Sequence, residues 1–360
     1  MGPTGEPQSL VRGARFTGSA VCLLLAVLTA LWIVRDLRLV DDPARLWWAW
    51  AGSGPDRFLT ATTLYDLVLL CVYVVVALGA FRSPVAASAL VVTGLVTLAV
   101  RAPALWAEGI AEVYPHGLRM RAMLGTFVAL GLAAALLIVV VAGRRPLRSY
   151  GRGITPTRPG RGAGVAAFLL LGFAGAGAAA WEVYWYVQNP GPPSLYADRF
   201  TGGGGALQLL GMPAGWASLV VVAVTLTGAC GALARAVHSR PLGLVGAGLI
   251  GVSGAAGVSV AVRADLFAGL GELDLVEQLM VGWWVFGLVA GVLLVLVLGR
   301  RGVGAQGPPR LAPNVYDGYG GGPTGGYGAG YSSGYGDAPD GGAPGGTFGP
   351  PPPSSRPPGW

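Results

Sequence analysis

Two copies of the tripeptide Asp-Arg-Phe are the residues of this sequence best suited to chemistry. They stand at Asp56-Arg57-Phe58 and Asp198-Arg199-Phe200, each after an aromatic cluster and before an apolar stretch. A guanidinium binds phosphate or carboxylate through paired hydrogen bonds, so each copy could hold an anion. Arg101 and Arg263, which end two later apolar stretches, complete this candidate site. The simpler interpretation is structural, because Trp and Tyr at headgroup depth commonly anchor a loop.

The other reactive residue types predict no catalytic centre, no metal site and no cofactor. Cys22, Cys71 and Cys230 fall in three different apolar stretches and lack metal-ligand or redox spacing. His116 and His238 are expected on opposite sides of a membrane, where they cannot share a metal. The sequence contains no Lys, which excludes a phosphate-binding loop of the P-loop type. These residues favour a non-catalytic protein, and leave open an enzyme that acts through the Asp-Arg-Phe loops.

Composition places the chain in a membrane. Of its 360 residues 53% are hydrophobic and 11% are charged, whereas soluble domains carry about 25% charged residues. This excludes a soluble enzyme, a disulfide scaffold and a nucleic-acid binder. All 24 basic residues are Arg and only two residues are Asn, a bias that indicates GC-rich codons and a bacterial source of high GC content.

Eight apolar stretches are long enough to cross a bilayer, which takes about 20 residues. Backbone polar groups in lipid must be satisfied within their own segment, so the stretches are predicted to be helices. The fold class is an all-α polytopic integral membrane protein. The predicted spans are 16–34, 62–80, 86–102, 123–142, 163–181, 215–234, 244–264 and 279–298.

Charge predicts the orientation in the inner (plasma) membrane. With the N-terminus in the cytoplasm, the inner segments hold 15 Arg and four acidic residues. The outer segments hold the other nine Arg and 13 acidic residues. Basic residues concentrate on the cytoplasmic side of membrane proteins, so both termini are predicted to be cytoplasmic. The net charge of +7 is thus a signal of topology rather than of nucleic-acid binding.

The spans are predicted to form two tandem four-helix units in parallel orientation. The first unit is expected over 16–145 and the second over 163–301, after a cytoplasmic N-terminal segment (1–15) and with an Arg-rich linker (146–162) between them. Similar landmarks recur in the same order in both units, including the two Asp-Arg-Phe copies. The glycines of the second unit are expected at the junction between the units, where small residues allow close packing.

A Gly/Tyr/Pro-rich tail is predicted to be disordered and cytoplasmic over 302–360. It has too few large aliphatic residues to build a core. Its tyrosines stand in a glycine matrix and are candidate contacts for a cytoplasmic protein partner: Tyr319, Tyr327, Tyr331 and Tyr335. A purely solubilising tail is the alternative.

Three functions remain open at the level of sequence. The first is a non-catalytic membrane scaffold or envelope-associated interaction protein, which fits the uncharged spans and the tail. The second is a permease or carrier for a neutral or lipid-like substrate, which fits the duplication. The third is a membrane enzyme acting at the outer face through the Asp-Arg-Phe loops. The expected partners are the lipid bilayer and a protein bound to the tail, with no nucleic acid; the sequence leaves the oligomeric state open.

Overall fold

The structure is a computed structural model that describes residues 8–53, 60–83, 86–107, 114–146, 157–203, 208–300 and 303–304. The chain divides into two units, Met1–Gly307 and Pro308–Trp360, and all described residues belong to the first. The tail tyrosines and most of the linker 146–162 lie outside the described residues.

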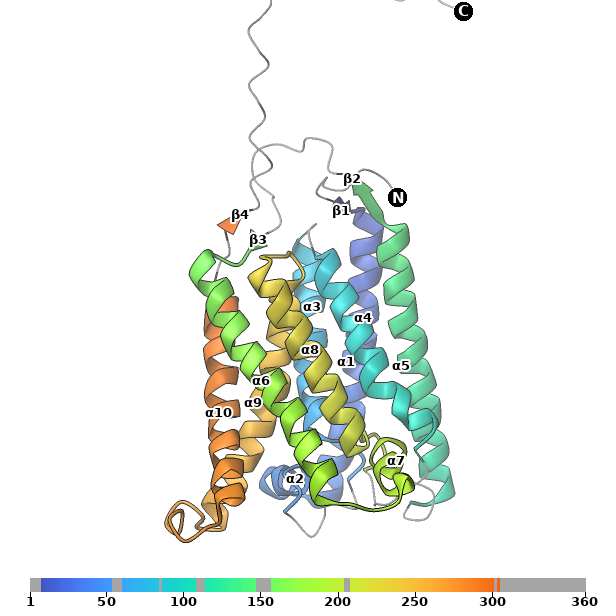
Figure 1. The fold of residues 1–360 in the computed structure, drawn as a ribbon. Helices are drawn as coiled ribbons and strands as arrows, with labels where there is room; N and C mark the ends of the chain where they lie inside the picture. The colour runs from blue at the N-terminus through green and yellow to red at the C-terminus, as the bar shows by residue number, and fades with distance from the viewer. Residues whose placement is uncertain are drawn as a thin grey trace, which may run out of the picture. The chain divides into compact units, whose positions relative to one another are not determined.

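Eight long helices make up the bundle (Figure 1), and each is long and apolar enough to cross a membrane. This confirms the predicted all-helical fold with eight helices of membrane-spanning length and hydropathy. The 3-10 helix η2 (Ala102–Leu105) continues the third of them. The long helices are α1 (Arg12–Val40), α3 (Leu64–Arg82), α4 (Ala87–Arg101), α5 (His116–Ala142), α6 (Arg161–Gln188), α8 (Ala214–Leu233), α9 (Ser239–Arg263) and α10 (Leu275–Gly299).

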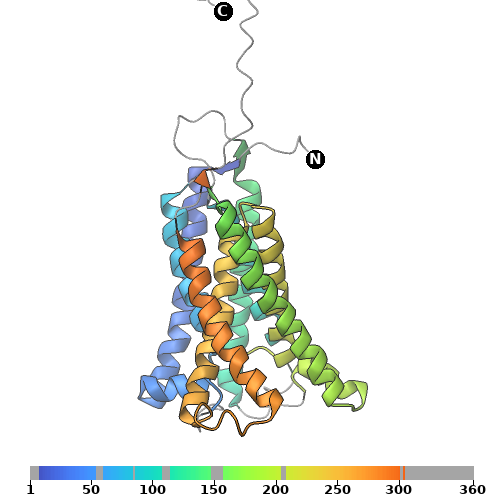
Figure 2. The ribbon, with the colours of Figure 1, turned by 60° about the vertical axis from the view of Figure 1, so that its left-hand side comes forward.

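Short elements mark the two ends of the bundle. The strands β1 (Gln8–Leu10) and β2 (Arg144–Pro146) pair antiparallel, as do β3 (Thr157–Arg158) and β4 (Val303–Gly304). The helices α2 (Pro43–Trp50) and α7 (Pro193–Thr201) lie at the opposite end. Figure 2 shows the same opposition from another side. We call these the strand end and the α2/α7 end.

The burial pattern of the bundle is the one expected for a protein surrounded by lipid. Large apolar side chains such as Val75, Ile138 and Val141 are exposed on the long helices, while polar residues such as Thr97 and Asp66 are buried. Apolar side chains cost nothing facing hydrocarbon, whereas polar ones must find partners inside the protein. Asp66 and Thr97 are accordingly turned inward, where each has a hydrogen-bond partner.

Within the bundle, helices α1–α5 form what we call the first half and α6–α10 the second half. In the first half α1 packs on α3 and α5, and α4 packs on α5; in the second half α6 packs on α8, and α9 packs on α8 and α10. The halves meet through α3 and α4 on one side and α8 and α9 on the other. One hydrogen bond across this junction runs from Trp216 Nε1 to Ala99 O at 2.7 Å.

The glycines of α9 pack mainly inside the second half, which corrects the prediction that they lie at the junction between the halves. Gly248 does face the first half, where a Cβ would lie 2.9 Å from Val68 Cγ1. In contrast, Gly251, Gly254 and Gly257 face α10. Their function is to bring α9 and α10 into backbone contact, which small residues permit where lipid supplies no hydrophobic driving force.

Candidate functional site

A buried ion pair ties α3 to α4 near the α2/α7 end. Asp66 is the third residue of α3, and its Oδ2 accepts hydrogen bonds from Thr63 N at 2.7 Å and Thr63 Oγ1 at 3.1 Å. Its Oδ1 accepts a hydrogen bond from Arg101 Nη2, at the last residue of α4. The side chains of Asp66 and Arg101 are 1% and 5% exposed. Each charge is thus desolvated and depends on the other.

The ion pair also touches the second half and a second polar layer. Arg101 Nη1 points to Leu210 O at 3.5 Å, on the segment before α8. Deeper along the same helices, the hydroxyls of Tyr73 and Thr97 are 2.9 Å apart. Ionisable groups at membrane depth are costly and concentrate where a membrane protein functions, so this pair is part of the candidate site.

A second buried carboxylate, Asp36 near the end of α1, holds the segment that leads into α3. It is fully buried and accepts hydrogen bonds from Ala61 N at 2.9 Å, from Thr62 N at 2.7 Å and from Thr62 Oγ1 at 2.6 Å. Arg35 Nη1 lies 2.6 Å from its other oxygen. Trp50 Nε1 at the end of α2 donates to Thr62 Oγ1 at 3.2 Å. Asp36 thereby fixes the position of Trp50.

Tyr114 closes the same segment from the side of α5. Its hydroxyl donates to Thr60 O at 2.9 Å. Burial raises the pKa of Tyr114 to about 12, and the Asp36 carboxylate adds to the increase. The phenol therefore stays neutral, and remains a hydrogen-bond donor, throughout the neutral pH range.

The second half has its own charged cluster, which docks α7 on α6 and α8. Glu182 Oε1 accepts hydrogen bonds from Arg199 Nη2 and from Ser218 Oγ, both at 2.6 Å. The Arg199 guanidinium also lies over the Trp185 ring, 3.9 Å from its centroid. This stacking adds a cation–π contact to the ion pair.

The predicted site residues are thus placed in separate contacts. Asp56, Arg57 and Phe58 lie outside the described residues. Arg101 pairs with Asp66 and Arg199 with Glu182, whereas the Arg263 guanidinium lies 4.6 Å from the centroid of the Trp48 ring.

The other two residues of the second copy are structural parts of α7. The carbonyl of Asp198 accepts a hydrogen bond from Gly202 N at 2.7 Å, which ends the helix. Phe200 contacts the Tyr196 ring, and its carbonyl accepts from Trp106 Nε1 at 3.3 Å. These contacts fit the anchoring interpretation of the motif.

A vestibule of about 340 Å³ lies where the two halves meet at the α2/α7 end. Its walls combine three aromatic residues with neutral polar and apolar ones, and none of its lining residues is charged. Tyr65 of α3 and Ser253 of α9 contribute one hydroxyl-bearing wall residue from each half. The lining residues are Trp50, Ala51, Thr63, Leu64, Tyr65, Gln208, Met212, Ser253, Ala256, Gly257, Val260 and Trp284.

The vestibule adjoins the charged groups described above. Thr63, whose backbone and hydroxyl bind Asp66, is also a wall residue. Trp50, which Thr62 and Asp36 hold in place, is another. The stacking of Arg263 on Trp48 joins α9 to α2 across the two halves. The buried charges thus serve as supports for the wall of the vestibule.

Comparison with models of protein families, with curated proteins and with solved structures finds no match for this chain. The site is therefore interpreted from its own geometry.

Proposed function

We propose that this protein is a non-catalytic membrane interaction protein that binds a neutral, hydroxyl-bearing ligand at its α2/α7 end. The observation that carries the proposal is the uncharged vestibule between the halves, with the hydroxyl-bearing residues Tyr65 and Ser253 in its wall. Its volume falls in the range of small-molecule sites, about 300–1,000 Å³. A ligand held there contacts both halves at once.

The lining indicates the chemistry of the ligand. A charged group would lose its hydration without gaining an opposite charge, so a neutral ligand is favoured. The rings of Trp50, Tyr65 and Trp284 offer broad apolar faces, while Thr63, Gln208 and Ser253 offer hydrogen-bonding groups. A sugar ring has the matching combination of apolar C–H faces and hydroxyls. The favoured ligand is therefore a sugar or the glycosyl headgroup of a lipid.

The proposed setting is the plasma membrane of a bacterium, with both termini in the cytoplasm and the α2/α7 end outside. The excess of arginine in the segments at the strand end supports this orientation. The tail, Pro308–Trp360, would then offer its tyrosines to a cytoplasmic partner.

Topology can be tested with reporter fusions. Alkaline phosphatase joined before Met1 or after Trp360 is expected to be inactive, because it folds only outside the cytoplasm. The same enzyme inserted after Gly271, in the connection between α9 and α10, is expected to be active. Activity at either terminus would contradict the proposed orientation.

An internal duplication is the proposed origin of the two halves. Several observations support it. Each half runs through a short strand, a long helix, a short helix that begins at or next to a proline, three long helices and a closing strand. The same tripeptide, Arg-Gly-Ala, begins α1 at Arg12 and α6 at Arg161, an offset of 149 residues. Trp32 of α1 and Trp181 of α6 are separated by the same offset. The vestibule lies at the junction such a duplication creates.

Ser253 provides the test of vestibule binding. Its substitution by Phe should fill the vestibule, whereas Ser259→Phe is the matched control. Both serines lie on α9 and donate to the carbonyl four residues back, at 2.9 and 2.7 Å, but Ser259 does not line the vestibule. Native mass spectrometry of protein released from nanodiscs containing a monoglycosyl diacylglycerol measures the retained glycolipid. We expect Ser253→Phe to lower retention about tenfold, a change of about 1.4 kcal/mol, with Ser259→Phe close to wild type. Equal retention in both variants would contradict the proposal.

A carrier for the same ligand is the second candidate, favoured by the buried Asp66–Arg101 pair beside the vestibule. Proteoliposomes distinguish the two. Uptake of a radiolabelled methyl glycoside that saturates, and that Ser253→Phe abolishes, would identify a carrier. Binding without uptake supports the interaction protein.

A further inference from the structure

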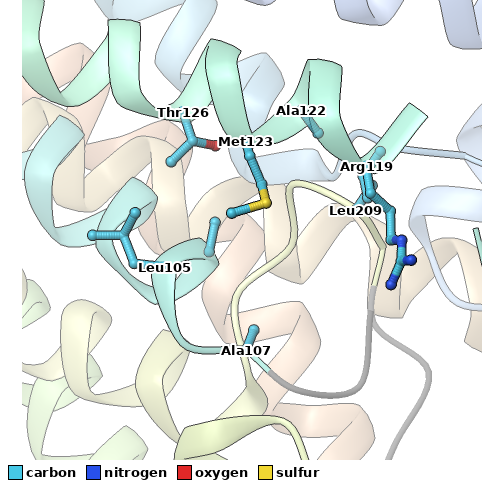
Figure 3. A pocket seen from close by; sticks show the side chains of 8 residues that line it. Leu105, Ala107, Arg119, Ala122, Met123, Thr126 and Leu209 are labelled. Carbon is cyan, nitrogen blue, oxygen red and sulfur yellow. The ribbon is translucent and has the colours of Figure 1, made fainter. Parts of the chain in front are cut away.

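A second cavity, separate from the vestibule, lies beside the first turns of α5. Its volume is about 200 Å³, and it is enclosed by α5, by η2 and the residues after it, and by the segment before α8 (Figure 3). Most of its wall is apolar, contributed by Ala104, Leu105, Ala122, Met123 and Leu209. Two polar residues, Arg119 and Thr126, complete the wall.

Thr126 differs from three other helical threonines of this protein. Thr93, Thr97 and Thr225 each donate to the carbonyl four residues back, at 2.7–2.9 Å. The hydroxyl of Thr126 has no hydrogen-bond partner within the described part of the chain, although the side chain is only 2% exposed. A buried hydroxyl without a partner is destabilising, so its presence in the cavity wall points to a ligand that supplies an acceptor.

Arg119 places a positive charge two turns away on the same face of α5. Seven residues of helix separate it from Thr126, a rise of about 10.5 Å. Arg119 is nearer the start of α5 and the α2/α7 end, and Thr126 is deeper in the bundle. The cavity therefore has a positive charge at the side nearer the α2/α7 end. Toward the middle of the bundle its wall is apolar except for the Thr126 hydroxyl.

The mouth of the cavity opens on the lipid-facing side. Met123 and Leu105 line it, yet each is 46% exposed. Leu124, Phe127 and Val128, which are also exposed, continue an apolar surface along α5. A molecule that enters from the bilayer can reach the cavity without crossing a polar surface.

We propose that this cavity binds an anionic phospholipid. The phosphate accepts hydrogen bonds from the Arg119 guanidinium. An ester carbonyl deeper in the lipid accepts a hydrogen bond from the Thr126 hydroxyl, and an acyl chain lies along Met123 and Leu105. The order of charge, hydroxyl and apolar wall along α5 matches the order of phosphate, ester and chain in a lipid of the nearer leaflet. The apolar walls favour a lipid over a free phosphate ion.

The test measures lipid retention by the full-length protein. The protein is purified from nanodiscs of phosphatidylcholine with added phosphatidylglycerol, and native mass spectrometry counts the bound phosphatidylglycerol. Arg119→Gln is expected to lower its retention about tenfold, the scale of charge-assisted hydrogen bonds. Arg121→Gln is the matched control, because Arg121 lies on the same helix turn, is exposed and does not line the cavity. Equal loss of phosphatidylglycerol in both variants would show that the lipid is held only by the general attraction of positive charge, and would contradict a specific site in this cavity.

Thr126→Val separates ligand binding from a structural role. Valine keeps the shape and removes the hydroxyl, so the melting temperature without phosphatidylglycerol is expected to stay the same or rise. The additional stabilisation by phosphatidylglycerol is expected to fall several-fold. Unchanged stabilisation by the lipid, or equal stabilisation of the wild type by inorganic phosphate, would contradict a lipid site.

Discussion

Asp66→Ala is expected to lower the free energy of unfolding by about 3–5 kcal/mol, the cost of leaving one partner of a buried ion pair without its counter-charge. Arg101 is 5% exposed and cannot recover hydration without opening the contact between α3 and α4. The substitution also removes the acceptor of two hydrogen bonds at the start of α3, which Thr63 N and Thr63 Oγ1 donate to Asp66 Oδ2. Equilibrium unfolding in mixed micelles with increasing SDS, followed by circular dichroism, measures the change.

Two further variants show whether the charge itself is responsible. The double variant Asp66→Leu with Arg101→Met removes both charges and is expected to recover most of the loss, because apolar replacement of a whole buried pair is often neutral. Asp274→Ala is the matched control, since this carboxylate is an N-cap that accepts a hydrogen bond from Glu277 N at an exposed helix start. It should cost only about 1 kcal/mol. A double variant as unstable as Asp66→Ala would refute the electrostatic explanation.

The membrane-spanning helices could be predicted from sequence because hydropathy over 20 residues depends on local composition alone. Their ends could not. The helix predicted over 16–34 extends in the structure over Arg12–Val40, and so includes Asp36. Hydropathy treats this carboxylate as the end of a span. In the structure it is satisfied by Ala61 and Thr62, 25 and 26 residues further along the chain.

The candidate site shows the same limit. Thr63 and Asp66 have the three-residue spacing of a capping pair, which could have marked the start of α3. The partner of Asp66 is 35 residues away, and no local pattern identifies it. The vestibule needs α2, α3, α9, α10 and the segment before α8 together, so it exists only in the folded protein. The repeated Asp-Arg-Phe motif was visible, but its arginine in α7 binds Glu182.

Gly254→Ala is expected to have the other large effect, a loss of stability at or above the usual 1–3 kcal/mol of an overpacked contact. A Cβ at this position would lie 2.3 Å from Leu288 N and 2.7 Å from both Gly287 C and Trp284 O. These are backbone atoms of α10, so no side chain can rotate away and the two helices must separate. The same SDS unfolding assay measures the loss.

Gly282→Ala is the control for this prediction, because a Cβ there meets nothing within 4 Å. Alanine favours a helix over glycine by about 1 kcal/mol, so the control is expected to be neutral or stabilising. The two substitutions add the same methyl group to neighbouring, packed helices, and only one adds it against a backbone. Separation of α9 and α10 would also move Trp284 away from Gly257, opening the vestibule wall that both form. Gly254→Ala should therefore reduce glycolipid retention as well as stability. Equal stability of the Gly254→Ala and Gly282→Ala variants would show that the packing of α9 on α10 does not require the close contact at Gly254.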